Sequence, residues 1–164
     1  MVTGELLRLL GGGLLVLAGA LFGWERCAVL RRRRDCLRSL CTALGQAEGE
    51  LTSLCTPLPE LFARLDDCPM FRLVSAAFGT EPLDRLWRRA AAEMPISREE
   101  QETLASLGGV LGRCDAERQA GEIRLVRQRL TEYAAAVERE IALRGRRFPG
   151  LGAAAGAILA VMLF

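Results

Sequence analysis

The carboxylates that could take part in acid–base chemistry occur as two adjacent pairs, Asp66 with Asp67 and Glu99 with Glu100. Two carboxylates that share a proton must face the same space, but neighbours in a helix point about 100° apart. Both pairs also fall at expected helix ends, where solvated acids are common. The chain has no histidine, so the commonest general base and the Ser–His and Cys–His nucleophile pairs are missing. We therefore expect no catalytic residues and no enzyme activity.

The cysteines and glycines do not form a pattern that binds a metal or a cofactor. No Cys-x-x-Cys pair occurs, so the spacing typical of zinc sites is absent. The glycine triplet at 11–13 is not followed by Gly-Lys-Ser/Thr and does not make a phosphate loop. We expect no metal and no cofactor, and we expect reduced thiols that pack as small apolar side chains. The six cysteines are Cys27, Cys36, Cys41, Cys55, Cys68 and Cys114.

Both ends of the chain carry long stretches without a charge. Leu9 to Gly23 contains 15 uncharged residues and Phe148 to Phe164 contains 17, the short end of what a bilayer core accepts. A cleaved secretory signal is the alternative for the first stretch, because residues 18–20 have the small-x-small form of a cleavage site. Its nearly neutral start and the arginines that follow it favour a retained membrane helix. We predict transmembrane helices over residues 1–24 and 149–164.

Arginine clusters lie just inside each of these segments, at residues 26–34 and 144–147. By the positive-inside rule both clusters mark the cytoplasmic side, which predicts a two-pass protein with residues 25–148 as a cytoplasmic domain. A nucleic-acid partner would be the other interpretation of the four consecutive arginines. A basic run next to a membrane helix is more typical of a topology signal or a contact with anionic lipid, so we expect no nucleic-acid partner.

Apolar residues in the first half of the domain follow a helical three-four spacing, which predicts a long amphipathic helix. Thr56 is the expected N-cap of the next helix with Pro57 in its first turn, and Gly79 is the expected left-handed C-cap of the helix after that. Ser97 and Glu100 have the spacing of a capping box. The leucines expected on the buried face of the first helix are Leu37, Leu40, Leu44, Leu51 and Leu54.

Residues 115–147 predict a last long helix, and no stretch has the alternation of a strand. Because the first and last helices must return to one membrane, we expect them to be antiparallel neighbours. The predicted fold is all-α, an antiparallel helical bundle flanked by two transmembrane helices. The expected buried stripe of the last helix contains Ile123, Val126, Leu130, Tyr133 and Val137.

Two groups of residues are candidates for contacts with other helices or proteins. Gly19 with Gly23, and Gly152 with Gly156, place two glycines on one helix face, which permits close approach of helices in lipid. The general richness of both segments in Gly and Ala is the alternative explanation of this spacing. On the last long helix we expect exposed arginines to bind a cytoplasmic partner, and the candidates are Arg124, Arg127 and Arg129.

The order and spacing of these parts resemble the stage III sporulation protein AB family. The likeness covers nearly the whole chain, from the glycine-bearing first helix and its arginine-rich exit to the apolar tail. The residues that carry it are TPLPE at 56–60, the helix of Trp87, Leu111 with Gly112, Asp115, Gln119, and Leu151 with Gly152.

This resemblance implies a non-enzymatic, membrane-anchored component of the channel complex between mother cell and forespore, needed for endospore formation and placed in the mother-cell membrane that surrounds the forespore. The cytoplasmic part of the family is similar to the helical domain of the F-type platform protein of type II secretion. That likeness implies a cytoplasmic secretion-type ATPase and other channel components as partners, and a homo-oligomer is a further expectation. The alternative is a membrane-tethered helical scaffold for envelope assembly, unrelated to secretion ATPases.

Overall fold

The structure is a computed structural model that describes the backbone of residues 2–54 and 56–163 and the side chains of residues 28–54 and 56–143. The chain divides into two compact units, residues 32–136 and residues 1–31 with 137–164. The elements in order are α1 (Val2–Ser53), α2 (Leu58–Arg64), α3 (Pro69–Ala76), α4 (Leu83–Ala92), α5 (Arg98–Ala105), the 3-10 helix η1 (Ser106–Gly109) and α6 (Ala116–Leu163).

Helices and the turns between them make up the described residues, with a single isolated bridge between Phe78 and Glu81 and no strand. This confirms the all-α prediction. Across the described residues, no helix combines the length and apolar character needed to cross a membrane. The predicted transmembrane segments 1–24 and 149–164 lie outside the residues whose side chains are described, and the proposed limits of the domain at 25 and 148 stay predictions.

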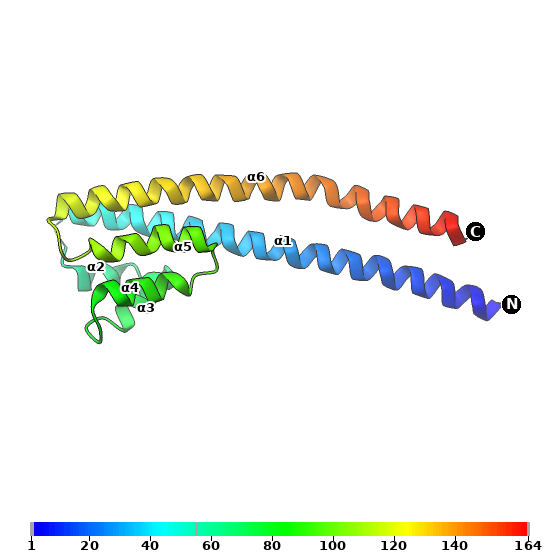
Figure 1. The fold of residues 1–164 in the computed structure, drawn as a ribbon, viewed down its shortest axis with the longest axis horizontal. Helices are drawn as coiled ribbons and strands as arrows, with labels where there is room; N and C mark the ends of the chain where they lie inside the picture. The colour runs from blue at the N-terminus through cyan, green and yellow to red at the C-terminus, as the bar shows by residue number, and fades with distance from the viewer. Residues whose placement is uncertain (1, 55, 164) are drawn as a thin grey trace. The chain divides into compact units, whose positions relative to one another are not determined.

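Within residues 32–136 the two long helices lie side by side and run in opposite directions (Figure 1). The Cys41 thiol of α1 contacts the Thr131 hydroxyl of α6. About two turns farther along α1, Glu48 contacts Arg124 of α6. Because the positions rise along α1 while they fall along α6, the pair is antiparallel, as the sequence predicts. Leucines of α1 and the stripe of α6 meet in the core, and the buried residues are Leu37, Leu40, Leu44, Leu51, Ile123, Val126 and Leu130.

Three aromatic rings from the short helices fill the other half of the core. Trp87 of α4 packs edge-on against Phe71 with a centroid distance of 5.6 Å, and Phe62 lies 6.0 Å from the same indole. The buried indole N–H of Trp87 donates to the backbone oxygen of Leu104 at 2.8 Å, which ties α4 to α5. Tilted ring pairs of this kind add to the stability from burial, so Trp87 is the centre of this half of the domain.

Three helix ends differ from the predictions. Pro57 occupies the N-cap position of α2, and Thr56 instead donates its hydroxyl to Glu50 at 2.7 Å, so the predicted Thr56 cap is wrong. Helix α3 ends at Ala76, three residues before Gly79, which adopts a φ of +85° in the turn that follows. Leu54 is 64% exposed rather than buried, because α1 ends at Ser53 and the chain turns away from the core.

Candidate coupling site at the start of helix α5

The start of α5 has the capping box that the sequence predicts. The Ser97 hydroxyl accepts a hydrogen bond from the backbone N–H of Glu100, and the Glu100 carboxylate accepts one from the backbone N–H of Ser97 at 2.7 Å. Each residue therefore satisfies a backbone donor that the first helical turn leaves without a partner. This local exchange fixes the direction in which the Glu100 side chain leaves the helix.

Glu100 also makes a long-range contact that the sequence did not suggest. Its carboxylate is 0% exposed and accepts hydrogen bonds from Arg33 of α1, at 2.6 Å from Nη2 and 3.0 Å from Nε. Burial raises the pKa of Glu100, but the hydrogen bonds from Arg33 and Ser97 outweigh it, so the pKa lies below its ordinary value. The expectation that this acid is a solvated helix-end residue is wrong, because Arg33 replaces the water that it would otherwise need.

The neighbouring acid makes the matching contact with the other long helix. The Tyr133 hydroxyl of α6 donates to the Glu99 carboxylate at 2.9 Å, and this hydrogen bond raises the pKa of Tyr133. Consecutive residues of a helix point about 100° apart, so Glu99 and Glu100 reach two different helices from one turn. We call Arg33, Ser97, Glu99, Glu100 and Tyr133 the coupling site, because it fastens the start of α5 to both α1 and α6.

Arg33 and Glu100 occupy positions that a core-facing stripe would otherwise fill. Arg33 lies four residues before the buried Leu37, and Glu100 lies four residues before the buried Leu104. A charge at such a position must find a partner inside the protein. This was the signal in the sequence that could have predicted the pair, although the spacing alone would not have matched one charge to the other.

A second carboxylate, Glu48, joins α1 to α6 nearer the end of α1. The Glu48 carboxylate of α1 forms ion pairs with two arginines of α6, at 2.6 Å from Arg124 Nε and 3.1 Å from Arg127 Nη2. The Glu48 side chain is 13% exposed. The structure therefore brings two of the three predicted partner-binding arginines onto an acid of the same domain. Arg129 lies apart from them on an exposed face of α6. Any partner of Arg124 or Arg127 would have to compete with Glu48.

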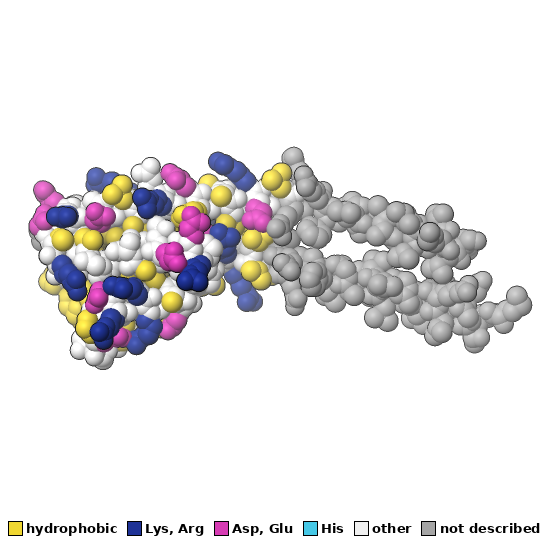
Figure 2. Space-filling model, viewed as in Figure 1, with side chains coloured by type: hydrophobic (Ala, Val, Ile, Leu, Met, Phe, Trp, Pro, Cys, Tyr) yellow, Lys and Arg dark blue, Asp and Glu magenta, His cyan; other side chains and the backbone are white. Residues whose placement is uncertain are grey.

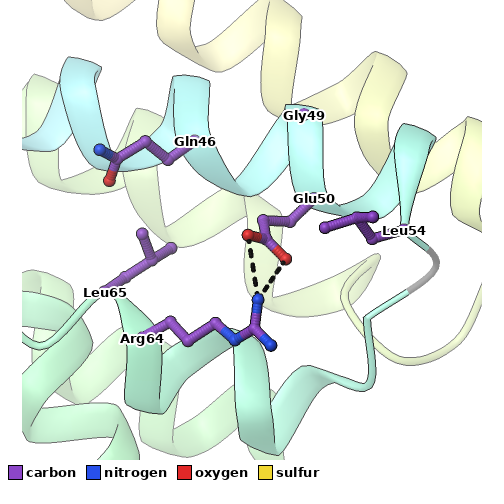
Figure 3. A pocket seen from close by; sticks show the side chains of 6 residues that line it. All are labelled: Gln46, Gly49, Glu50, Leu54, Arg64 and Leu65. Carbon is purple, nitrogen blue, oxygen red and sulfur yellow. Dashed lines mark hydrogen bonds and ion pairs between the residues drawn. The ribbon is translucent and has the colours of Figure 1, made fainter.

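The surface also has an open hollow, with a volume of about 410 Å³, where the end of α1 meets α2. Figure 3 shows Glu50 and Arg64 facing each other across it, with both carboxylate oxygens 3.4 Å from Arg64 Nη1. Thr56 donates to Glu50, and Glu60 lies 2.7 Å from the other terminal nitrogen of Arg64. The charged groups on the lip of the hollow are thus already engaged with one another. The residues that line it are Gln46, Gly49, Glu50, Leu54, Arg64 and Leu65.

The thiols and acids of the described residues do not gather into a reactive centre. Burial raises the pKa of the Cys36 thiol to about 11 and also raises that of Cys41, so both are protonated near neutral pH and are poor nucleophiles. Residues 28–54 and 56–143 contain no group of three His, Cys, Asp or Glu side chains that could hold a metal ion. The predicted packing glycines Gly19, Gly23, Gly152 and Gly156 lie outside the residues whose side chains are described.

Comparison with known proteins gives the family. No curated protein matches the chain. A solved structure described as stage III sporulation protein AB is 22% identical, covers 68% of this chain and 97% of its own chain, and has a TM-score of 0.60, which supports the same fold. The family model of stage III sporulation protein AB matches residues 8–164. The chain therefore belongs to the stage III sporulation protein AB family.

Proposed function

We propose that this sporulation protein is a non-enzymatic, membrane-anchored component of the channel complex between mother cell and forespore, and a platform-like partner of a cytoplasmic secretion-type ATPase. In this role it holds a helical domain at the membrane and passes mechanical load between a bound partner and its anchors. Membership of a sporulation family supports the cellular process. The resemblance of the family's cytoplasmic part to the platform protein of type II secretion supports the ATPase.

The coupling site is the observation that carries this proposal. A domain that passes load needs its short helices fastened to the helices that lead to the anchors, and Glu100 and Glu99 fasten α5 to α1 and α6. Charged and hydrogen-bonded contacts of fixed geometry resist sliding better than apolar contacts, which are non-directional. Glu48 adds a second fixed point between α1 and α6. The three acids thus join α1, α5 and α6 to one another within residues 32–136.

The membrane arrangement in this proposal has two passes, with the helical domain in the cytoplasm and both termini on the other side. Its support is the position of the arginine clusters at residues 26–34 and 144–147. Labelling with an impermeant thiol reagent tests it in intact non-sporulating cells that produce the chain, because their cell membrane faces the medium. Cys114 should be protected until the cells are opened, and a cysteine added after Phe164 should react at once. Reaction of Cys114 in intact cells would contradict the arrangement.

A sporulation assay tests the function itself, with heat-resistant spores counted in a strain that makes only the altered chain. Deletion of residues 149–164 should reduce the count to that of a strain without the protein, and an unrelated apolar helix in their place should restore it. Asp66→Ala and Asp67→Ala should leave the count unchanged, because both side chains are exposed. Loss of spores from either exchange, with the protein still folded, would contradict the non-enzymatic role.

Capture of the ATPase separates this proposal from an envelope scaffold. The full chain, isolated in mild detergent from sporulating cells, should carry the secretion-type ATPase of the sporulation complex with it. The same chain isolated from cells in which the ATPase is tagged should be recovered through that tag. Failure in both directions, with normal sporulation, would favour the scaffold.

A further inference from the structure

The outward face of α4 carries three exposed arginines within two turns. Arg85, Arg88 and Arg89 are exposed, while Leu86 and Trp87 between them are buried. The exposed face of α5, by contrast, has Glu99 and Glu102 beside Arg98. In Figure 2, arginine side chains gather over the part of the domain where α4 lies in Figure 1. Helix α4 is therefore a strongly amphipathic helix whose solvent face is basic.

Two carboxylates near this face are already paired. Asp84 lies 3.4 Å from Arg88 and 3.9 Å from Arg113 of the loop before α6, and Glu81 lies 2.7 Å from Arg89. Arg85 has no ion-pair partner among the described residues. With the exposed Glu93 at the end of α4, four arginines stand against three acids, which leaves one arginine in excess. We call Arg85, Arg88, Arg89, Arg113, Asp84 and Glu81 the α4 surface.

An apolar ring lies next to these charges. Phe78, at the turn between α3 and α4, forms the isolated bridge with Glu81 and is 39% exposed. Its inner side packs against Phe62 with a centroid distance of 5.8 Å, so the ring is held in place. A fixed, partly exposed aromatic side chain beside arginines has the composition of a protein-binding surface, where aromatic residues and arginine are enriched.

We propose that the α4 surface is the docking site for an acidic surface of the secretion-type ATPase, a proposal that rests on the proposed function above. The exposed Arg85, which has no ion-pair partner among the described residues, provides charge complementarity for a carboxylate of the partner, which a guanidinium group binds through a pair of hydrogen bonds. Phe78 provides an apolar contact at the edge. Arg124 and Arg127, which already bind Glu48, are less available for such a contact than Arg85.

A protein fits this surface better than an anionic membrane does. Asp84 and Glu81 lie among the arginines, and lipid phosphates would repel them, whereas the side chains of a protein can place a cation opposite each acid. Phe78 is held against Phe62 and cannot insert deeply into a bilayer. The acids also hold Arg88 and Arg89 in fixed directions, which reduces the entropy lost when a partner binds.

The test is the affinity of the full chain, purified in mild detergent, for the purified ATPase, measured by biolayer interferometry. We expect Arg85→Glu with Arg88→Glu to weaken binding about tenfold or more, and we expect the affinity of the unaltered chain to fall as salt rises. Arg118→Glu with Arg98→Glu is the matched control. Arg98, like Arg88, is exposed and pairs with an acid four residues away, and Arg118, like Arg85, is exposed without an ion-pair partner among the described residues. This control should change the affinity less than twofold, and thermal unfolding should show that both variants stay folded.

The possible results test the ATPase partnership and the docking site on the α4 surface separately. If the unaltered chain does not bind the ATPase, both the partnership in the proposed function and the docking site are wrong. If the chain binds and the α4 reversal binds equally well, only the docking site is wrong. The docking site is also wrong if the reversal changes self-association in sedimentation and leaves ATPase binding intact. Protection of α4 from hydrogen exchange in phosphatidylglycerol nanodiscs but not in phosphatidylcholine nanodiscs, with ATPase binding unchanged, would assign the surface to lipid instead.

Discussion

Arg33 and Glu100 are 67 residues apart in the chain and form an ion pair in which the carboxylate is entirely buried while the guanidinium remains partly exposed, at 28%. The pair joins the first long helix to the first turn of α5. Since the same carboxylate also caps that turn through Ser97, helix start and helix attachment depend on one side chain.

Replacement of Glu100 by Gln should destabilise the domain by about 1.5–3 kcal/mol, because it removes charged hydrogen bonds and leaves Arg33 without its acid. Glu102→Gln is the control, since Glu102 is exposed and pairs with Arg98 in the same helix, and it should cost less than about 0.5 kcal/mol. Urea unfolding of residues 25–148, followed by circular dichroism at pH 7, measures both. Equal effects of the two exchanges would mean that the buried pair adds nothing to stability.

The stability of the domain should fall at acid pH in part through this acid. The pKa of Glu100 in the folded domain lies below its ordinary value, which in an unfolded chain is about 4.3. The unfolded chain therefore binds more protons there, so this stabilisation is complete above that pH and is lost as the pH falls through the folded pKa. The difference in unfolding free energy between the domain and Glu100→Gln should shrink from pH 7 to pH 3. A constant difference would show that the pKa is not lowered.

Gly108 should tolerate no larger residue, because η1 lies close against α4 at this point. A Cβ atom there would be 3.2 Å from both the Asp84 backbone oxygen and the Trp87 Cβ. Gly108→Ala should destabilise by about 1–3 kcal/mol. Gly121→Ala in α6 is the opposite case, since nothing lies within 4 Å, and it should stabilise by about 0.5–1 kcal/mol. Thermal unfolding of the two variants should shift in opposite directions.

Trp87 should contribute to the free energy of unfolding in two separate ways, through the volume of its ring and through its indole N–H. Trp87→Ala removes a buried ring and should cost about 3–5 kcal/mol. Trp87→Phe keeps most of the apolar contact but removes the indole N–H that donates to the Leu104 oxygen, and it should cost about 1–3 kcal/mol. Chemical denaturation separates the two values. A cost under about 1 kcal/mol for the alanine variant would contradict the central position of the ring in the core.

If Glu48 and Arg124 form an ion pair that stabilises the domain, exchange of their charges should restore stability that a single charge reversal removes. Arg124→Glu places two acids together and should destabilise by about 1 kcal/mol, since the arginine is largely exposed. Addition of Glu48→Arg to Arg124→Glu should restore part of the loss, and Arg129→Glu alone should have little effect on unfolding. If the double variant is less stable than the sum of its single changes, the pair does not contribute as the geometry suggests.

The secondary structure and its capping box follow from local patterns, and they were predicted well. Apolar spacing along α1 and α6 identified most of the buried stripe, because a helix must bury one continuous face whatever its partner is. Ser97 and Glu100 were predicted to cap α5 because both partners lie within one turn of chain. Thr56 shows the limit of the same reasoning. As an N-cap its hydroxyl would accept a hydrogen bond from a backbone N–H, but it instead donates to the Glu50 carboxylate, which the turn after α1 brings near.

By itself, the sequence determined the all-α class, the antiparallel order of the long helices and the resemblance to a family that the match across residues 8–164 then showed. Only the tertiary structure decided which charges meet. Arg33 with Glu100 and Arg124 with Glu48 join residues more than 65 positions apart, and many arginines could have filled either place by spacing alone. Periodicity specifies the face on which a side chain lies, but the pairing of two faces depends on how several helices pack at once.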